Sequence, residues 1–440
     1  DEQKNSNHGS KIPLEHIGWR EFFTDQRLLK LIETALENNR DLKVAMLNIE
    51  RDRAQYRIQR AELFPNIVAS ANQSRQRTQV FGANTTFTHQ YNVTVGVTAY
   101  ELDLFGRMKS LKTEALEQFY ATVETQKSLQ ISLIAQVASS YLTLLADKDI
   151  LKFLQESLEA QRSSHELVKK SIEQGIGSQI DLVQSTTNLE RAKANVFKQR
   201  QIVSEDKNTL SLLIGSALSS DFETGFSLEN QKIIVYLPEN LNSEVLLKRP
   251  DILAAEHQLK AANAHIGAAR AAFFPSISLT GSLGYTSTEL SSLFLKDSQT
   301  WSFVPSIHLP IFSGGNNIAQ LNLSETNKKI FITRYEKAIQ NAFKEVADSL
   351  SAQENLEQQL KSDTCSLSSQ SKYHDLTELR FKNGITPYIS VLEARITLLN
   401  AKQVFTLALL ARYNNMITLY KVLGGGVFEL SESEEKKKNT

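Results

Sequence analysis

Cysteine is nearly absent from the 440-residue sequence, which contains only Cys365. A single thiol excludes a disulfide within the chain and every metal cluster built on cysteines, so we interpret Cys365 as a small residue on a helix. Proline and glycine are scarce, at 8 and 18 residues, and this composition is unlike that of a disordered chain. The fold is therefore expected to depend on packing rather than on covalent crosslinks.

An excess of either charge is also missing, because 49 Lys and Arg residues balance 49 Asp and Glu residues. No global electrostatic field would recruit nucleic acid or an acidic substrate. The mean hydropathy of −0.29 argues against a polytopic helical membrane protein. Residues 128–146 carry no formal charge, but their seven Ser, Thr and Gln side chains favour a packed helix over a membrane span.

Enzyme motifs are absent too. The sequence contains no G-x-x-x-x-G-K-[ST], H-E-x-x-H or G-x-S-x-G pattern. His257 and His265 would lie about 12 Å apart along one helix, which is too far for a shared metal ion. We therefore predict no catalytic residue, no cofactor and no metal site.

Self-similarity is the strongest positive signal in the sequence. Asp41–Pro65 matches Asp251–Pro275 in length, and both segments end on a Phe-Pro pair. Farther along, QGIGSQIDLVQ (174–184) matches NGITPYISVLE (383–393) at a spacing of 209 residues. Because such matches extend over nearly the whole chain, we interpret it as two copies of one structural unit.

Each copy has the pattern of a helix, two strands, a very long helix, a tight turn and a further helix. The strands alternate apolar and polar residues, as at the apolar odd positions from Val93 to Ala99. Each long helix continues without proline for about 100 Å at 1.5 Å per residue, and it therefore needs lateral partners along its length. The expected segments are an N-terminal segment (1–40), a first repeat (41–215) with strands 66–80 and 91–105 and helices 107–174 and 178–213, a linker (216–248), a second repeat (249–424) with strands 276–288 and 301–312 and helices 316–383 and 387–422, and a polar tail (425–440).

The change from helical to strand periodicity falls on Phe64-Pro65 in the first copy and on Phe274-Pro275 in the second. Proline disfavours helix in the residue before it and cannot donate to a continuing helical ladder. We therefore predict a joint between a helix and a strand at each of these pairs.

Four strands with one apolar face raise the problem of unpaired edges, because a sheet of four cannot close on itself and lipid offers no hydrogen bonds. Three chains would supply about twelve strands, an even number within the range of outer-membrane barrels. The odd positions would then face lipid, and the Ser, Thr and Asn positions would face a wet lumen. Tyr91, Tyr285 and Trp301 are expected at strand ends, where interfacial aromatic residues belong.

Several motifs resemble those of TolC-type outer-membrane efflux factors, in particular the branch that serves three-component drug-export pumps. They include YELDLFGR (100–107), KRPDILAAEHQLKAANAHIGAARAAFFPSISLTG (248–281) and RFKNGITPYISVLEARITLLNAK (380–402). The resemblance implies an α+β membrane protein, a homotrimer with a transmembrane β-barrel of about 12 strands and a periplasmic tunnel of about 12 α-helices. It also implies passive export of drugs and small toxic compounds through the bacterial outer membrane, in partnership with a periplasmic adaptor protein and an inner-membrane pump.

The N-terminus bears on how the chain is anchored. Many members of this branch carry a lipidated N-terminal cysteine, whereas the present sequence begins at Asp1 in a polar stretch. We expect an exported chain to have lost its signal peptide. The presence and the absence of a lipid anchor both stay open.

In this family, the turns between the helices form a periplasmic tip that constricts the tunnel and contacts the adaptor. Ser390 stands where the family has an acidic residue, and Phe381 and Thr386 stand where some members carry a tyrosine and an arginine that hold neighbouring helices closed. Residues three apart share one helix face, and rings of carboxylates from several chains favour cations. The alternative interpretation is a solvated helix tip. The resemblance places the acidic gate positions at Asp181, Ser390 and Glu393. The repeat adds Gln184 as the counterpart of Glu393, and Tyr388 is a candidate steric plug. The expected adaptor contacts are the helix tips at Gly175, Ser178, Gly384, Thr386 and Pro387.

Three alternatives stay open at the level of sequence: a soluble trimeric coiled-coil protein, a metal-ion export channel and a protein export channel. A coiled coil would not need four strands with one apolar face. Only three methionines are present, so the sequence gives no support to a lining for soft metal ions.

Overall fold

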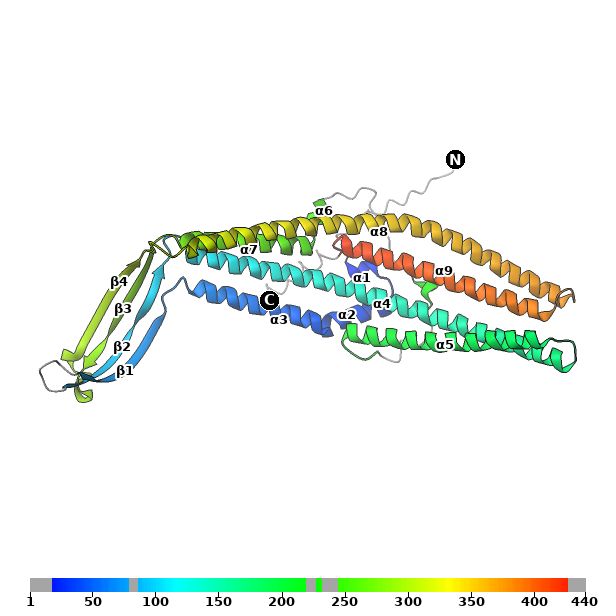
Figure 1. Cartoon of the computed structure of the whole chain (residues 1–440), viewed down its shortest axis with the longest axis horizontal. Coiled ribbons are helices and arrows are strands. Elements are labelled where there is room, and N and C mark those ends of the chain that lie inside the picture. Colours follow the sequence, from blue (N-terminus) through cyan, green and yellow to red (C-terminus); the bar gives the residue numbers. More distant parts are fainter. Residues whose placement is uncertain (1–17, 79–85, 219–226, 232–243, 426–440) are drawn as a thin grey trace, which may run out of the picture. The chain divides into compact units, whose positions relative to one another are not determined.

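The computed structural model describes residues 18–78, 86–218, 227–231 and 244–425, which form two compact units (Figure 1). The first, called the helical unit below, lies within Asp1–Met46, Thr125–Ile252 and Ala338–Thr440. The second, called the sheet unit, comprises Leu47–Glu124 and Leu253–Lys337. Each compact unit therefore contains segments of both sequence repeats.

The sheet unit contains one antiparallel sheet with the strand order β1-β2-β3-β4. Apolar residues lie opposite one another on one face, where Val95 pairs with Leu283 and Leu283 pairs with Trp301. Leu283 is 56% exposed and Trp301 is 75% exposed, so this face is an open apolar surface. The strands are β1 (Ile67–Thr78), β2 (Thr86–Leu102), β3 (Ser276–Ser287) and β4 (Gln299–His308).

The opposite face of the sheet is polar, because the alternate positions carry hydroxyl groups that bond across the strands. Glycine on this face lets two strands approach closely, since a Cβ on Gly284 would collide with the carbonyl oxygen of Val93 in β2. The cross-strand hydroxyl pairs are Ser70 with Thr94, Ser278 with Ser306, and Ser282 with Ser302, at 2.9, 2.7 and 2.8 Å.

A bulge in β2 limits the alternation that the sequence predicts. The register shifts between Val97 and Tyr100, where Ala99 adopts a positive φ of 49° and donates its N–H to the hydroxyl of Thr280. A bulge adds one residue to a strand and reverses its alternation. The rule of apolar odd positions is therefore wrong beyond Val97, and Tyr100 lies opposite the apolar Leu279 instead.

The strand ends also differ from the predicted bounds. β2 starts at Thr86, so Tyr91 lies inside the strand and the expectation that it marks a strand end is wrong. β2 stops at Leu102, and the carboxylate of the next residue, Asp103, accepts a hydrogen bond from the backbone N–H of Met108 in the following helix. β4 stops at His308, two residues before Pro310, which has no N–H for a strand ladder. The expected linker falls partly, and the expected tail almost wholly, outside the described residues.

The two sequence repeats produce helices of matching length. The composition of the two long helices explains why they are continuous, because Ala, Leu, Glu, Gln and Lys favour helix and no proline interrupts them. α3 (Arg40–Ala61) and α7 (Pro250–Ala271) have 22 residues each, α4 (Arg107–Glu173) and α8 (Asn316–Lys382) have 67 each, and α5 (Gln179–Ile214) and α9 (Tyr388–Val422) have 36 and 35.

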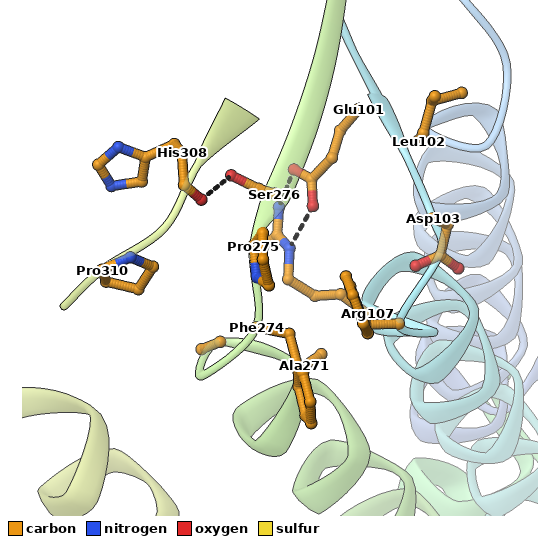
Figure 2. A pocket seen from close by; sticks show the side chains of 12 residues that line it. Glu101, Leu102, Asp103, Arg107, Ala271, Phe274, Pro275, Ser276, His308 and Pro310 are labelled. Atoms are coloured by element: carbon orange, nitrogen blue, oxygen red, sulfur yellow. Dashed lines mark hydrogen bonds and ion pairs between the residues drawn. The ribbon is translucent and has the colours of Figure 1, made fainter. Parts of the chain in front are cut away.

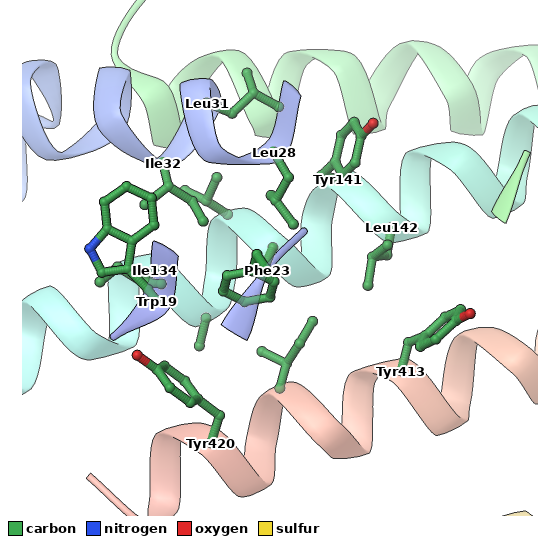
Figure 3. Close-up of a cluster of buried hydrophobic side chains, with 14 of the residues drawn as sticks. Trp19, Phe23, Leu28, Leu31, Ile32, Ile134, Tyr141, Leu142, Tyr413 and Tyr420 are labelled. Carbon is green, nitrogen blue, oxygen red and sulfur yellow. The ribbon is translucent and has the colours of Figure 1, made fainter. Parts of the chain in front are cut away.

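The core of the helical unit surrounds the middle of α4 (Figure 3). Two N-terminal helices, α1 (Trp19–Phe22) and α2 (Gln26–Asn38), contribute to it together with α9. Tyr420 of α9 stacks on Phe22, with ring centroids 4.4 Å apart. Tyr141 of α4 donates a hydrogen bond of 2.8 Å to the carboxylate of Asp25. Each large apolar side chain buried here contributes about 2 kcal/mol, so the N-terminal segment helps to hold α4 and α9 together.

By length and composition α4 could cross a membrane, because it contains an apolar window of 18 residues. However, 61% of that window is buried inside the protein. Val137, Ala138 and Leu142 from the uncharged stretch 128–146 are fully buried in the core. The interpretation of this stretch as a packed helix is therefore confirmed.

Short helices complete the described residues. In the expected linker, the 3₁₀ helix η3 (Leu228–Asn230) is tied to α4, because Asp149 accepts hydrogen bonds of 2.9 Å from the Ser227 hydroxyl and from the Leu228 N–H. Asp149 thus fixes the start of η3 on the surface of the core. The other short helices are α6 (Glu244–Leu247), η4 (Leu290–Ser292) and η5 (Lys296–Ser298).

Candidate functional site

The turn after α4 ends that helix with a Schellman motif. The N–H of Ile176 donates to the carbonyl of Ser171, and the N–H of Gly175 donates to that of Ile172, both at 2.9 Å. Gly175 has a φ of +73°, which glycine adopts without strain. Nothing lies within 4 Å of the position that a Cβ would take, so the backbone conformation alone requires glycine here.

The turn after α8 repeats this geometry. The N–H of Ile385 donates to the carbonyl of Arg380 at 2.9 Å, and the N–H of Gly384 donates to that of Phe381 at 2.8 Å. Gly384 has a φ of +72° and equally open surroundings. Both turns lie at the same end of the helical unit (Figure 1). The duplicated sequence thus produces a duplicated helix tip.

The helices that leave the two turns begin differently. Ser178 caps α5, because its hydroxyl accepts the N–H of Ile180 at 3.2 Å. Pro387 precedes α9 and makes no side-chain cap. The half-buried Thr386 next to it has a hydroxyl without a hydrogen-bond partner among the described residues. The adaptor contacts assigned to these tip residues stay predictions.

The predicted gate residues lie on the first two turns of α5 and α9. Asp181, Gln184 and Glu393 are exposed, whereas Ser390 is half-buried. Gln184 donates to Asn188 on its own helix at 3.2 Å. Within the described residues of one chain, no hydrogen bond or ion pair joins the gate residues of α5 to those of α9. The gate assigned to these residues stays a prediction.

Tyr388, the predicted steric plug, packs against Phe381 across the α8–α9 turn. The ring centroids lie 5.1 Å apart with an interplanar angle of 50°. This contact links the end of α8 to the start of α9 and leaves Tyr388 40% exposed. The exposed ring is available for a contact outside its own helix pair.

Apolar residues at the tips are functional candidates that the sequence reasoning missed. Ile176 is 80% exposed and Ile385 is 63% exposed, although both are large and apolar. The signal for them lies in the repeat, because the two residues occupy equivalent positions 209 residues apart. Ile180 and Val183 extend the exposed apolar surface along α5, at 78% and 65%. Their exposure makes these residues candidates for a protein contact.

The helix–strand joints have one local geometry in both copies. The N–H of Phe64 donates to the carbonyl of Ala61, and the N–H of Phe274 donates to that of Ala271, both at 3.0 Å. A tight turn thus closes α3 and α7 before Pro65 and Pro275. Phe274 stacks on Phe105 with ring centroids 4.8 Å apart and an interplanar angle of 13°. This stack ties the second joint to the end of the first strand pair.

A cavity of about 220 Å³ lies beside the second joint (Figure 2). Arg107, the first residue of α4, forms a bidentate pair with Glu101 of β2, at 3.0 and 2.8 Å. Asp103 caps α4 by accepting the N–H groups of Met108 and Lys109 at 3.0 and 2.8 Å. Three residues of the YELDLFGR motif therefore fix the change from strand to helix. The motif alone does not indicate these roles, because they depend on contacts between the strand and the helix.

A family model described as outer membrane efflux protein matches residues 31–216 and 241–425. The chain belongs to this outer membrane efflux protein family. The toluene efflux pump outer membrane protein TtgC of Pseudomonas putida is 43% identical over 415 residues, which are 94% of this chain and 86% of that protein. The outer membrane protein OprJ of Pseudomonas aeruginosa is 36% identical over 416 residues, 94% of this chain and 87% of that protein.

Solved structures show the same relationship. The open state of the MtrE outer membrane channel of Neisseria gonorrhoeae superposes with a TM-score of 0.87 and 38% identity, over 96% of this chain and 95% of that one. The CmeC outer membrane channel of Campylobacter jejuni gives a TM-score of 0.84 and 26% identity, over 97% of this chain and 91% of that one. The predicted fold, a periplasmic helical tunnel with a membrane strand domain, is confirmed.

As an outer membrane efflux protein, the chain is the outer-membrane exit duct of an efflux pump, with its helical tunnel in the periplasm, and it is not an enzyme. Its partners are the periplasmic and inner-membrane components of such a pump. The alternative of a soluble coiled-coil protein is wrong. The assignment of the strand face with Leu283 and Trp301 to lipid stays a prediction, which the exposure of both side chains favours.

Proposed function

We propose that three copies of this chain assemble into one duct, in which about twelve strands close a barrel. The open sheet carries this proposal. β1 and β4 each have a strand neighbour on one side only within the described residues, and an unpaired edge in lipid leaves N–H and C=O groups without partners. Pairing β4 of one copy with β1 of the next satisfies both edges.

Small toxic organic compounds are the cargo that we assign to the duct. Relatives are named for toluene efflux and antibiotic efflux. The polar face of the sheet supports passive conduction, because its cross-strand pairs are uncharged hydroxyl groups. A lumen lined in this way offers hydrogen bonds but no strong charge to retain a solute.

Asp181 and Glu393 are the gate residues in this proposal. Both are exposed, Asp181 on the first turn of α5 and Glu393 on the second turn of α9, so three copies would present two rings of carboxylates at the tip. The exposed Ile176 and Ile385 on the adjacent turns supply the apolar surface for the adaptor. One tip would thus combine the constriction with the docking surface.

The assembly and the conduction are tested on protein extracted from the outer membrane. Native mass spectrometry in detergent is expected to give a trimer, and planar bilayers are expected to show discrete channels. A monomer without channel activity would overturn the proposal. Deleting the gene is expected to raise the cellular accumulation of dyes and the sensitivity to toluene. Accumulation of metal ions or of a secreted protein instead would assign the cargo to those classes.

The gate is tested with the double variant D181N/E393Q. Removing both carboxylates is expected to raise single-channel conductance or to lower the preference for cations, because the rings no longer hold cations at the constriction. The matched control E190Q/E354Q removes two exposed carboxylates from α5 and α8 away from the tip. If D181N/E393Q kept the conductance and the selectivity of the wild type, the proposed gate would be wrong. The proposal of a trimeric duct would not be affected.

A further inference from the structure

A groove with a volume of about 700 Å³ lies among α4, α7 and α8 of the sheet unit. The gate, the tips and the joints described above do not account for it. Its volume falls in the range of small-molecule sites, about 300 to 1,000 Å³. Its walls come from the first turns of α4, the middle and end of α7, and Lys328 and Ile332 of α8, about a quarter of the way along that helix.

The walls of the groove are largely apolar. Phe105, Leu259 and Ile332 line the groove with large side chains. Ala264 and Gly267 of α7 have small or no side chains and leave space on that side. At the edge of the groove α7 and α4 approach closely, since a Cβ on Gly267 would lie 2.5 Å from the hydroxyl oxygen of Ser110. The three helices therefore offer a slot that fits the apolar body of a ligand.

Positively charged residues outnumber negatively charged ones in the groove. Lys109, Lys260 and Lys328 line it, against the single acidic residue Glu117. The carboxylate of Glu117 already accepts a hydrogen bond of 2.7 Å from His257, and Lys260 pairs with Glu256 at 2.7 Å. In the part of the chain that the structure describes, the ammonium groups of Lys109 and Lys328 have no ion-pair partner. The groove thus joins an apolar wall to two uncompensated positive charges.

We propose that this groove binds amphipathic organic anions, with the apolar body against Leu259 and Ile332 and the acidic headgroup at Lys109 and Lys328. The inference rests on the proposed function, because such anions belong to the small organic compounds that we assign to the duct as cargo. Lysine suits this task, since a flexible ammonium group can follow the headgroups of different ligands. A cationic amphiphile of the same size would meet like charges and would be disfavoured.

A reporter inside the groove tests this proposal. Asn263 lines the groove and is exposed, so N263C in a C365S background accepts a bimane fluorophore whose emission reports the local environment. The full-length protein is placed in nanodiscs of zwitterionic lipid and titrated with dodecanoate. Dodecyltrimethylammonium, a cation with the same alkyl chain, is the comparison ligand.

Dodecanoate is expected to shift the bimane emission with saturation, and dodecyltrimethylammonium is not. In the variant K109Q/K328Q, the half-saturation concentration for dodecanoate is expected to rise about tenfold, from the loss of two charged contacts. The control K361Q/K372Q removes two exposed lysines of α8 outside the groove and is expected to bind like the parent. Added salt is expected to weaken binding to the parent more than to K109Q/K328Q.

Equal shifts with the anion and the cation, or an unchanged half-saturation concentration in K109Q/K328Q, would overturn the proposal. Both failures are distinguishable from a failure of the proposed duct. Binding is measured at equilibrium and does not require conduction, whereas channel activity in planar bilayers is measured without dodecanoate.

Discussion

A carboxylic acid pair between α4 and α5 makes the stability of the helical unit depend on pH. Asp206 of α5 meets Asp147 of α4, whose carboxylate also accepts a hydrogen bond of 2.6 Å from Gln199. Burial, together with the hydrogen bond and the charge of Asp147, raises the pKa of Asp206 to about 6. Two carboxyl groups in contact need a shared proton to form a hydrogen bond. The pair therefore holds α4 to α5 more firmly when it is protonated.

The sign and size of the effect follow from the shift. The pKa of Asp206 rises from 3.8 to about 6, so the folded state binds the proton more tightly than the unfolded chain does. The contribution of Asp206 to stability is then greatest below pH about 4, falls as the pH rises toward 6, and is lowest above it. A rise of the pKa from 3.8 to about 6 corresponds to about 3 kcal/mol of stability, but Asp206 is only partly buried. Solvent screening reduces the expected loss to about 1 kcal/mol.

The variant D206N tests this reasoning, because an asparagine amide donates to Asp147 without needing a proton. Urea unfolding of the detergent-solubilised protein, followed by circular dichroism, is expected to show D206N about 1 kcal/mol more stable than the parent at pH 8 and no more stable at pH 4. D375N removes a carboxylate that is 72% exposed and serves as the control. If D206N and the parent lose stability equally between pH 4 and pH 8, the shared proton is wrong.

Three further substitutions test other parts of the fold. G175A is expected to cost about 1 kcal/mol, measured as the free energy of unfolding, because alanine is strained at a positive φ although space is open around it; an unchanged value would refute the Schellman turn. G284V is expected to reduce the yield of folded barrel in heat-modifiability gels, because any side chain here collides with β2; normal folding would contradict the close approach of the strands. R249M is expected to cost about 3 kcal/mol in urea unfolding, because the buried Arg249 bonds Asp251, Glu345 and the carbonyl of Val422; a loss below 1 kcal/mol would show that Arg249 does not hold α7, α8 and α9 together.

Periodicity and repetition made much of the fold predictable from the sequence. The alternation in β1, β3 and β4 survives in the observed register, since residues of one parity lie opposite each other. The glycines of both tips could be read from the repeat, because each must take a positive φ to reverse a helix. The bulge at Ala99 could not be predicted, because a positive φ at alanine is set by tertiary contacts such as the bond to Thr280.

Residues that act together from distant segments were out of reach of sequence reasoning. The packing of Phe22 on Tyr420 joins the first helix to the last one. The groove that contains Lys109 and Lys328 combines three helices, and each lysine taken alone reads as an ordinary surface residue. Local sequence patterns predict the secondary structure and the apolar face of each helix. Sites of this kind depend on which helices pack against each other in the tertiary structure.

The equal lengths of α4 and α8 restrict how this duplicated chain can change. Each helix has 67 residues between its strand pair and its glycine turn. Three residues inserted into α4 alone would displace its turn by about 4.5 Å along the helix axis and rotate it by about 300°, while the turn of α8 stayed in place. The two helices must therefore keep equal lengths for their turns to stay at the same level. A change in tunnel length is tolerated only when both copies change by the same number of residues.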